Sequence, residues 1–314
     1  MPARGVHAAA VAALALLAAW PARVVAAERR ATPMETARAQ GVRSRSPYVG
    51  ALAADADTGR VLFEENADAE ACPASVTKLM TLLLVLEDVE AGKLSLSERV
   101  VATPDALKYS EPSWVNFVAG GSMTVDDLLM SLMVKSANDA AIALGVRCAG
   151  SWEAFVERMN ERAASLGMKR TRYYNPNGLP PVSSEKRYPW KSYNKTTCRD
   201  QLKLAMKLAK MPGVFRYTSA KLGEVTDGGG HRLSFVNHNN LMVKNKMKVR
   251  NPDGSEAVDG FKTGYVDFAG SSIVLTGKRG SKRAIVVVLG SSTSRERDAA
   301  AGRLLSDALD ALDW

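Results

Sequence analysis

The segment that most constrains the fold is an apolar run from Leu79 to Leu86, interrupted only by Thr81. Pro73 lies just before it, and proline is favoured in the first turn of a helix. The run predicts a helix that is hydrophobic on nearly every side, and such a helix has to be buried in the middle of a domain. The composition, 46% hydrophobic and 24% charged, is that of a globular chain able to form such a core.

Strand patterns stand near both ends of the chain. Residues 49–53 and 61–63 alternate apolar positions around a turn at 57–59, which predicts a β-hairpin. Residues 271–276 and 284–289 predict two further strands joined through Gly280. Thr293 and Glu296 then have the spacing of a capping box for a last helix.

Helical patterns fill the middle of the chain. They cover residues 124–133, 138–148, 152–166 and 199–210. Thr124 and Asp127 are suited to cap the first of these helices. A long loop is expected over 175–195, which is rich in Pro, Asn, Gly and Ser, and strands and turns are expected after Pro212.

This order of elements predicts an α+β fold. The simplest packing is one antiparallel sheet built from the two chain ends and covered by a helical layer. We expect a signal peptide over residues 1–26, a flexible tether over 27–46 and a single domain over 47–314.

The first residues resemble a secretory leader. A short basic start precedes an apolar run at 8–20, and Pro21 and small residues at 24–27 follow. An uncleaved membrane anchor is the alternative, but the run is shorter than the roughly 20 residues that span a bilayer. We expect an exported, periplasmic or extracytoplasmic protein that is soluble after cleavage.

Charge and cysteine content limit the partners. The formal net charge is +9, but the basic residues are dispersed and not interleaved with aromatics, so nucleic acid is not an expected partner. Attraction to anionic wall polymers or lipid head groups and a merely solvated basic surface both fit this charge. Cys72, Cys148 and Cys198 are an odd number and no disulfide framework is expected. Metal-ligand spacings are missing, so no metal site is expected.

Ser75 and Lys78 begin the central helix. Residues three apart lie on one side of a helix, about 5–6 Å apart at Cβ. A lysine can take the proton of a serine if burial or a neighbouring cation lowers its pKa, and a helix start directs N–H groups toward a developing oxyanion. The same spacing recurs at 183–186 and 192–195 within the polar loop, so the pair alone also fits an ordinary helix start.

Two further triplets carry polar side chains. Ser136-Ala137-Asn138 lies where one helix ends and the next begins, which would open two polar side chains to a cleft or simply cap a helix. Lys262-Thr263-Gly264 precedes a strand and offers a cation, a hydroxyl and close backbone approach, or simply a turn.

The three motifs together, in this order, match the S-x-x-K, S-x-N and K-T-G set of penicillin-binding proteins and class A β-lactamases. The chain resembles the low-molecular-mass penicillin-binding D-alanyl-D-alanine carboxypeptidases over roughly residues 47–314. The segments that carry the resemblance are Ala56–Leu62, Pro73–Thr81, Leu166–Met168, Asn175–Leu179 and Val258–Tyr265.

The resemblance implies a serine peptidase that removes the terminal D-alanine from peptidoglycan stem peptides. Ser75 would form the acyl-enzyme, Lys78 would act as its base and Ser136 would relay a proton to the leaving amine. Asn138 would hold the substrate amide. The backbone N–H groups of Ser75 and Tyr265 would form the oxyanion hole.

The resemblance also assigns the substrate carboxylate. Lys262 would keep the site positive, Thr263 would bind the carboxylate with Arg283 assisting, and Gly264 would admit the ligand. No cofactor is implied, and β-lactam antibiotics would act as covalent inhibitors.

Some features depart from the family. Position 137 is alanine where glycine is also common, and the loop at 181–195 is longer than usual, which affects substrate preference. Cys72 beside the nucleophile is unusual, and a buried filler or an oxidation-sensitive thiol both fit it. Because Trp314 follows the last helix closely, we expect no second domain and no C-terminal membrane anchor.

Three alternatives remain. An endopeptidase that cuts D-alanyl cross-links would share every site residue. A β-lactamase would also need a deacylating carboxylate, and no Glu-x-x-Leu-Asn segment lies between Asn138 and Lys262. A non-catalytic wall-binding module would have no need of all the motif residues.

Overall fold

The structure is a computed structural model that describes residues 33–39, 41, 45–115, 117–181, 189–244 and 247–313. These residues belong to one compact unit, Ala31–Trp314. The leader expected over 1–26 lies outside the described residues. Within the segment expected to be a tether, Pro33–Ala39 form helix α1, with Met34 and Ala37 buried.

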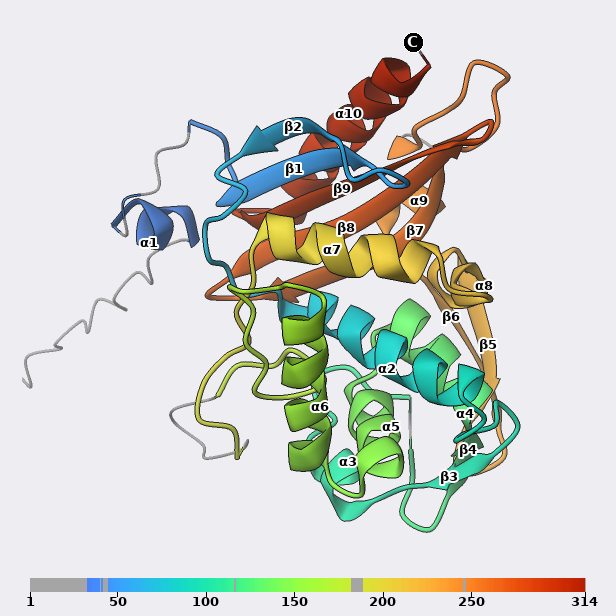
Figure 1. Ribbon diagram of the computed structural model, residues 1–314. Coiled ribbons are helices and arrows are strands. Elements are labelled where there is room, and N and C mark those ends of the chain that lie inside the picture. The colour runs from blue at the N-terminus through green and yellow to red at the C-terminus, as the bar shows by residue number, and fades with distance from the viewer. Residues whose placement is uncertain are drawn as a thin grey trace, which may run out of the picture. The chain divides into compact units, whose positions relative to one another are not determined.

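The centre of the fold is a five-stranded antiparallel sheet with the order β2-β1-β9-β8-β7 (Figure 1). The strands are β1 (Gly50–Asp55), β2 (Val61–Glu65), β7 (Val258–Val266), β8 (Gly270–Arg279) and β9 (Lys282–Ser291). β1 pairs with β9, so the two ends of the domain meet in the middle of the sheet. The predicted sheet from both chain ends is confirmed.

The side chains of the sheet alternate between two cores. On β9, Val286 and Val288 pack with helix α10 (Ser294–Leu312), whereas Ile285, Val287 and Leu289 belong to the larger core on the opposite face. Figure 1 shows α10 on one face of the sheet and the remaining large helices on the other. Thr293 caps α10, because its Oγ1 accepts from Glu296 N and donates to the Glu296 carboxylate.

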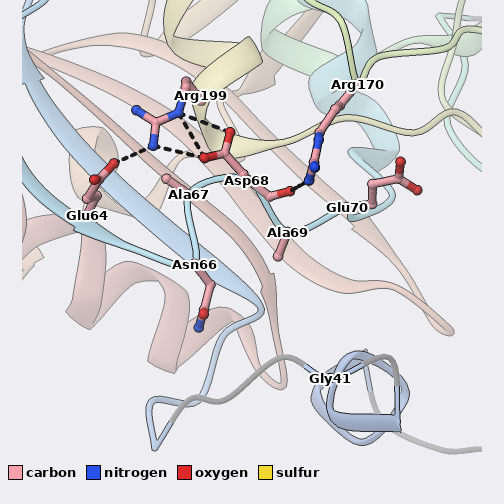
Figure 2. Close-up of a pocket in the computed structure, with 9 residues that line it drawn as sticks. All are labelled: Gly41, Glu64, Asn66, Ala67, Asp68, Ala69, Glu70, Arg170 and Arg199. Carbon is pink, nitrogen blue, oxygen red and sulfur yellow. Dashed lines mark hydrogen bonds and ion pairs between the residues drawn. The ribbon is translucent and has the colours of Figure 1, made fainter.

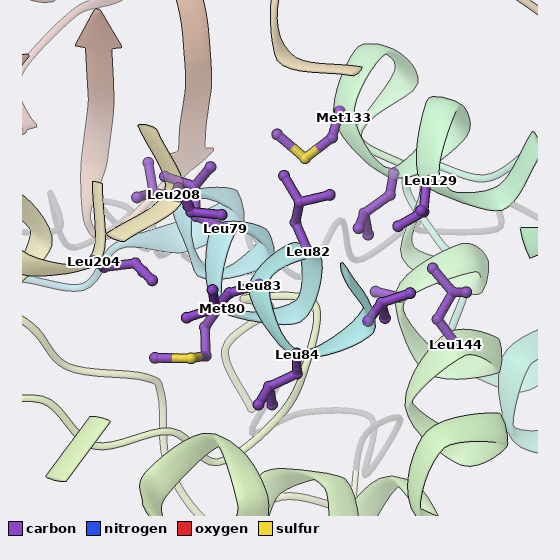
Figure 3. Packing of buried hydrophobic residues seen from close by; sticks show 14 of the residues in the cluster. Leu79, Met80, Leu82, Leu83, Leu84, Leu129, Met133, Leu144, Leu204 and Leu208 are labelled. Carbon is purple, nitrogen blue, oxygen red and sulfur yellow. The ribbon is translucent and has the colours of Figure 1, made fainter. Parts of the chain in front are cut away.

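Helices make up the larger layer. They are α2 (Lys78–Glu90), α3 (Pro104–Lys108), α4 (Val125–Met130), the π-helix η2 (Ser131–Lys135), α5 (Asn138–Ala149), α6 (Trp152–Ser165) and α7 (Cys198–Ala209). Helix α2 is buried on nearly all sides, as its apolar run predicts. Figure 3 shows Leu79, Leu82 and Leu84 of α2 pointing in different directions into the surrounding side chains.

The structure corrects two local expectations. Ser75 is in a separate 3₁₀ turn, η1 (Ala74–Thr77), and α2 begins only at Lys78. After Pro212 the chain forms helices α8 (Val214–Thr218) and α9 (Asn240–Val243) as well as strands. These short elements are fixed by tertiary packing against the sheet and the helical layer, which local propensity does not reveal.

Two small hairpins complete the described chain, and the second lies where strands and turns are expected after Pro212. They are β3 (Arg99–Val101) with β4 (Ser122–Thr124), and β5 (Leu222–Thr226) with β6 (Arg232–Val236). The three cysteines are unpaired. In the described part of the chain, no helix is both long enough and apolar enough to cross a membrane.

Candidate active site

The 3₁₀ turn η1 brings Ser75 to the buried end of α2. Lys78 Nζ lies 3.0 Å from Ser75 Oγ. Ser75 is half-buried, whereas Lys78 is fully buried. The hydroxyl is therefore the accessible member of this pair and the amine the enclosed one.

Lys78 Nζ has two more partners, Asn138 Oδ1 at 2.8 Å and the carbonyl oxygen of Asn177 at 2.8 Å. Both of these oxygens only accept hydrogen bonds, whereas the Ser75 hydroxyl can also donate. Burial, followed by the positive charge of Lys262, lowers the pKa of Lys78 well below its usual value, although the carboxylate of Asp139 opposes this. A neutral amine would donate to the two oxygens and accept the serine proton.

The second lysine is also buried. Lys262 is on β7, and burial together with the guanidinium of Arg297 lowers its pKa to about 7. The pKa of His238 is lowered to about 4. The causes are partial burial of its ring and the charges of Lys262, Lys135 and Lys78. These mutual influences describe a positive region around the Ser75–Lys78 pair. The sequence reasoning assigned no role to Arg297 or His238.

The Ser136-Ala137-Asn138 segment connects η2 to α5, and Asn138 is the first residue of α5. Ser136 is buried with φ of 62°, a left-handed conformation that turns the chain sharply between the two helices. Two residues on, Asn138 donates through Nδ2 to the carbonyl of Glu111 at 3.2 Å while its Oδ1 accepts from Lys78. In the structure both ends of this amide are therefore used within the protein.

Asp139 follows directly and is also buried. Its carboxylate accepts from the backbone N–H groups of Val115 (3.0 Å), Phe117 (3.4 Å) and Ala140 (2.9 Å). Burial raises its pKa to about 6 despite these bonds. Sequence reasoning missed this residue, although an acid directly after the triplet was visible.

The segment Asn175–Leu179 forms the floor below the lysine. Asn194 ties it in place, because its Nδ2 donates to Asn175 O at 3.0 Å and to Thr77 Oγ1 at 2.9 Å, and its Oδ1 accepts from Asn175 N at 3.2 Å. Gly178 has φ of 91°, and a Cβ there would overlap the carbonyl of Ala74. The floor therefore packs directly on the backbone of η1, the turn that carries Ser75.

Strand β7 closes the other side. A Cβ on Gly264 would lie 2.5 Å from Pro73 O and 3.1 Å from Ser75 N, so the missing side chain serves packing within the protein. Thr263 is buried, and Tyr265 is 60% exposed. The edge strand β7, which carries Lys262, Thr263 and Tyr265, therefore touches η1.

Arg283 lies elsewhere. Its guanidinium donates to Asp259 Oδ1 at 2.7 Å and to Thr276 Oγ1, and it stacks over Phe215. Arg283 is paired with Lys278 on β8, whereas Thr263 is paired with Ile273, which is five residues or about 17 Å away along the strand. Arg297, near the start of α10, is the basic residue whose charge acts on Lys262, and its guanidinium is paired with Asp298 at 2.6 Å.

A pocket of about 620 Å³ lies away from this cluster (Figure 2). Arg199 forms ion pairs there with Glu64 at 2.6 Å and Asp68 at 3.0 Å, so the positive charge of Arg199 is already compensated. In the ranges that the structure describes, no group of three or more His, Cys, Asp or Glu side chains could hold a metal ion.

The fold and this cluster define the class of penicillin-binding, β-lactamase-like proteins. Penicillin-binding protein D2 from Listeria monocytogenes, in its ampicillin-bound form, superposes with a TM-score of 0.68 at 28% identity, covering 85% of this chain and 99% of that one.

The chain belongs to the D-alanyl-D-alanine carboxypeptidase family, whose model matches residues 36–293. It is 32% identical over 255 residues to the carboxypeptidase DacF of Bacillus subtilis, covering 81% of this chain and 60% of DacF. It is 29% identical over 226 residues to the D-alanyl-D-alanine endopeptidase of Pseudomonas aeruginosa PAO1, covering 72% and 65%. The chain thus spans about three fifths of the length of the curated relatives.

Proposed function

We propose that this protein is a serine D-alanyl-D-alanine carboxypeptidase that removes the terminal D-alanine from peptidoglycan stem peptides. The observation that carries the proposal is the 3.0 Å contact between the Ser75 hydroxyl and the fully buried amine of Lys78. Burial lowers the pKa of this amine and so favours its neutral form, which at this distance can accept the serine proton.

The reaction proceeds in two steps. Ser75 Oγ attacks the carbonyl carbon of the bond between the two D-alanines while its proton passes to Lys78 Nζ. The tetrahedral oxyanion is held by the N–H groups of Ser75 and Tyr265, and collapse breaks the C–N bond as the leaving nitrogen takes a proton through Ser136. Water then attacks the ester carbonyl while Lys78 accepts its proton, and the bond to Ser75 Oγ breaks as Lys78 returns that proton to Oγ.

The remaining site residues hold the substrate. Lys262 and Thr263 bind the terminal carboxylate, and we place Arg297 beside them in the role first given to Arg283. Asn138 orients the substrate amide in exchange for one of its present bonds. Gly264 keeps β7 close to the nucleophile turn.

The proposal also covers the cellular location of the protein and its inhibitors. We infer an exported, extracytoplasmic protein with a catalytic domain over 47–314 that works on cell-wall peptide without a cofactor. β-Lactam antibiotics acylate Ser75, in line with the ampicillin-bound structure of the Listeria relative. The ester then breaks down slowly, because no Glu-x-x-Leu-Asn segment occurs between Asn138 and Lys262.

The test is D-alanine release from diacetyl-L-Lys-D-Ala-D-Ala. We expect release by the wild type, no release by Ser75→Ala, and unchanged release by Ser97→Ala, which removes an exposed serine hydroxyl. Release by Ser75→Ala at the wild-type rate would contradict the proposal.

An endopeptidase is the second candidate, because one relative is named as such. Digestion of cross-linked muropeptides, followed by mass analysis, separates the two functions. Products one D-alanine lighter support the carboxypeptidase, whereas separated monomers support the endopeptidase.

A further inference from the structure

A short strap, residues 111–115 with Phe117, lies against the start of α5. The carbonyl of Ser113 accepts from Asn138 N at 2.7 Å, and Ser113 Oγ donates to the carbonyl of Lys135 at 2.9 Å. The carbonyl of Glu111 accepts from the Asn138 side chain. The strap is therefore bound to both residues that flank the Ser136–Ala137 turn.

The strap has two further contacts, with Asp139 and with the turn between β5 and β6. The Asp139 carboxylate accepts from the N–H groups of Val115 and Phe117. A Cβ on Gly228, in the turn between β5 and β6, would lie 3.0 Å from the ring of Phe117. Val115 and Phe117 are buried between these supports.

Trp114 is the exception within this anchored segment. Its side chain is 46% exposed, although the residues on either side of it are bonded to Asn138 and Asp139. A large apolar ring on a rigid backbone loses little conformational entropy when it binds a partner. The strap thus presents a preorganised aromatic surface.

This surface is linked by hydrogen bonds to Ser75, the proposed nucleophile. Ser113 accepts from Asn138, Asn138 accepts from Lys78, and Lys78 contacts Ser75. Trp114 is thus one residue away from a chain of three hydrogen bonds that ends at the nucleophile. Its neighbour Ser113 contacts the first residue of α5, whereas β7 meets the turn η1 that carries Ser75.

The other aromatic residues near the site are less suitable. Tyr265 is exposed, but its hydroxyl donates to Asp267 at 2.9 Å and its backbone belongs to β7. Trp152 and Trp190 are at most 7% exposed and contact each other edge to face. Trp114 is the ring whose apolar area is available on a fixed support.

We propose that Trp114 determines specificity for the residue that precedes the two D-alanines, by packing against a long aliphatic side chain at that position. The inference rests on the proposed carboxypeptidase function. A stem peptide held between β7 and the Ser136–Asn138 turn extends away from its terminal carboxylate, and its next side chain has to meet one rim of the site. The strap provides that rim.

The experiment compares two peptides, diacetyl-L-Lys-D-Ala-D-Ala and acetyl-L-Ala-D-Ala-D-Ala. The ratio of their kcat/KM values is measured for the wild type, Trp114→Ala, Trp114→Phe and the control Val101→Ala, which removes an exposed apolar side chain on β3. We expect Trp114→Ala to lower the ratio about tenfold, because burial of methylene groups is lost. Trp114→Phe should keep most of the ratio and Val101→Ala all of it.

Two results would overturn the inference. Trp114→Ala could leave the ratio unchanged, or it could slow both peptides by the same factor, which would assign Trp114 only to holding the strap. A wild type that releases D-alanine from neither peptide would instead defeat the proposed function, and the inference with it. A wild type that is active but lacks any preference would defeat the inference alone.

Discussion

In the proposed mechanism, the charge of Lys78 decides whether Ser75 can react. Its amine is fully buried among Ser75, Asn138 and Asn177, and two opposing charges act on it. Lys262 lowers its pKa and Asp139 raises it. Because only the neutral amine accepts a proton, the rate of acylation should fall as the pH drops through the pKa of Lys78.

This balance predicts opposite effects of two substitutions. Lys262→Gln removes a positive charge, so the pKa of Lys78 rises and the acidic limb of the acylation profile moves to higher pH. Asp139→Asn removes a negative charge, so the limb moves to lower pH wherever Asp139 is ionised, above its pKa of about 6. We expect shifts of about one unit, measured as the rate of penicillin acylation against pH.

The control for this pair is Lys93→Gln, an exposed lysine beyond the far end of α2 whose loss should leave the limb in place. Shifts of the same sign for Lys262→Gln and Asp139→Asn would show that the two charges do not act on Lys78 as described.

At this scale the sequence predicted the motif residues but not their surroundings. The meeting of Ser75 with Lys78 follows from a three-residue spacing, whereas the contact of Lys78 with Asn177 joins positions 99 residues apart. Arg283 is on β9 and Arg297 is on α10, and only the register of β8 shows that Arg283 lies five residues along the strand from the partner of Thr263. Asp139 could have been noted as an acid beside the triplet.

Among the elements, the 3₁₀ turn η1 depends most on its neighbours. It is enclosed between Gly178 of the floor and Gly264 of β7, and Ala74 within it has φ of 49°. A residue held in a left-handed conformation is strained and persists only if the surrounding structure holds it. The position of Ser75 is therefore determined by two glycines that are distant in sequence.

This enclosure predicts the effect of one added methyl group. Gly178→Ala meets the backbone of Ala74 and Ser75, so we expect acylation to fall at least a hundredfold and stability to fall by about 3 kcal/mol. Gly230→Ala is the matched control, because φ is 87° there and nothing lies within 4 Å. That control should cost only about 1 kcal/mol and leave acylation intact.

Urea denaturation and stopped-flow penicillin binding measure the two quantities. Equal acylation by both variants would mean that the floor does not position Ser75.

Long elements were predictable and short ones were not. The apolar run of α2, the hairpin of β1 and β2 and the capped helix α10 follow from periodicity and capping. The turn η1, the helices α8 and α9 and the β3–β4 hairpin are only three to five residues long, and packing rather than propensity fixes them. Of the expected loop at 181–195, only residue 181 and residues 189–195 lie within the described part of the chain.

Across the whole molecule, the sheet separates two cores, although Arg297 near the start of α10 acts on Lys262 of the site. The site lies on the side of α2 and α5, whereas α10 fills the second core on the opposite face. Leu305 of α10 is fully buried and packs against Gly277 of β8.

Leu305→Ala should therefore destabilise the protein without altering its reactivity. We expect a loss of about 3 kcal/mol from the cavity that it leaves, and an unchanged penicillin acylation rate per folded molecule. Leu222→Ala, at a half-exposed position on β5, should cost less than about 0.5 kcal/mol. A slower acylation rate in Leu305→Ala would show that the two faces of the sheet are coupled.

The central claim is that one hydroxyl, deprotonated by a buried amine, carries the covalent chemistry. The most direct measurement is to label the protein with a fluorescent penicillin, digest it and identify the labelled peptide by mass. We predict a single adduct on Ser75, which disappears in Ser75→Ala and forms much more slowly in Lys78→Met. An adduct on another residue, or undiminished labelling of Ser75→Ala, would contradict the account.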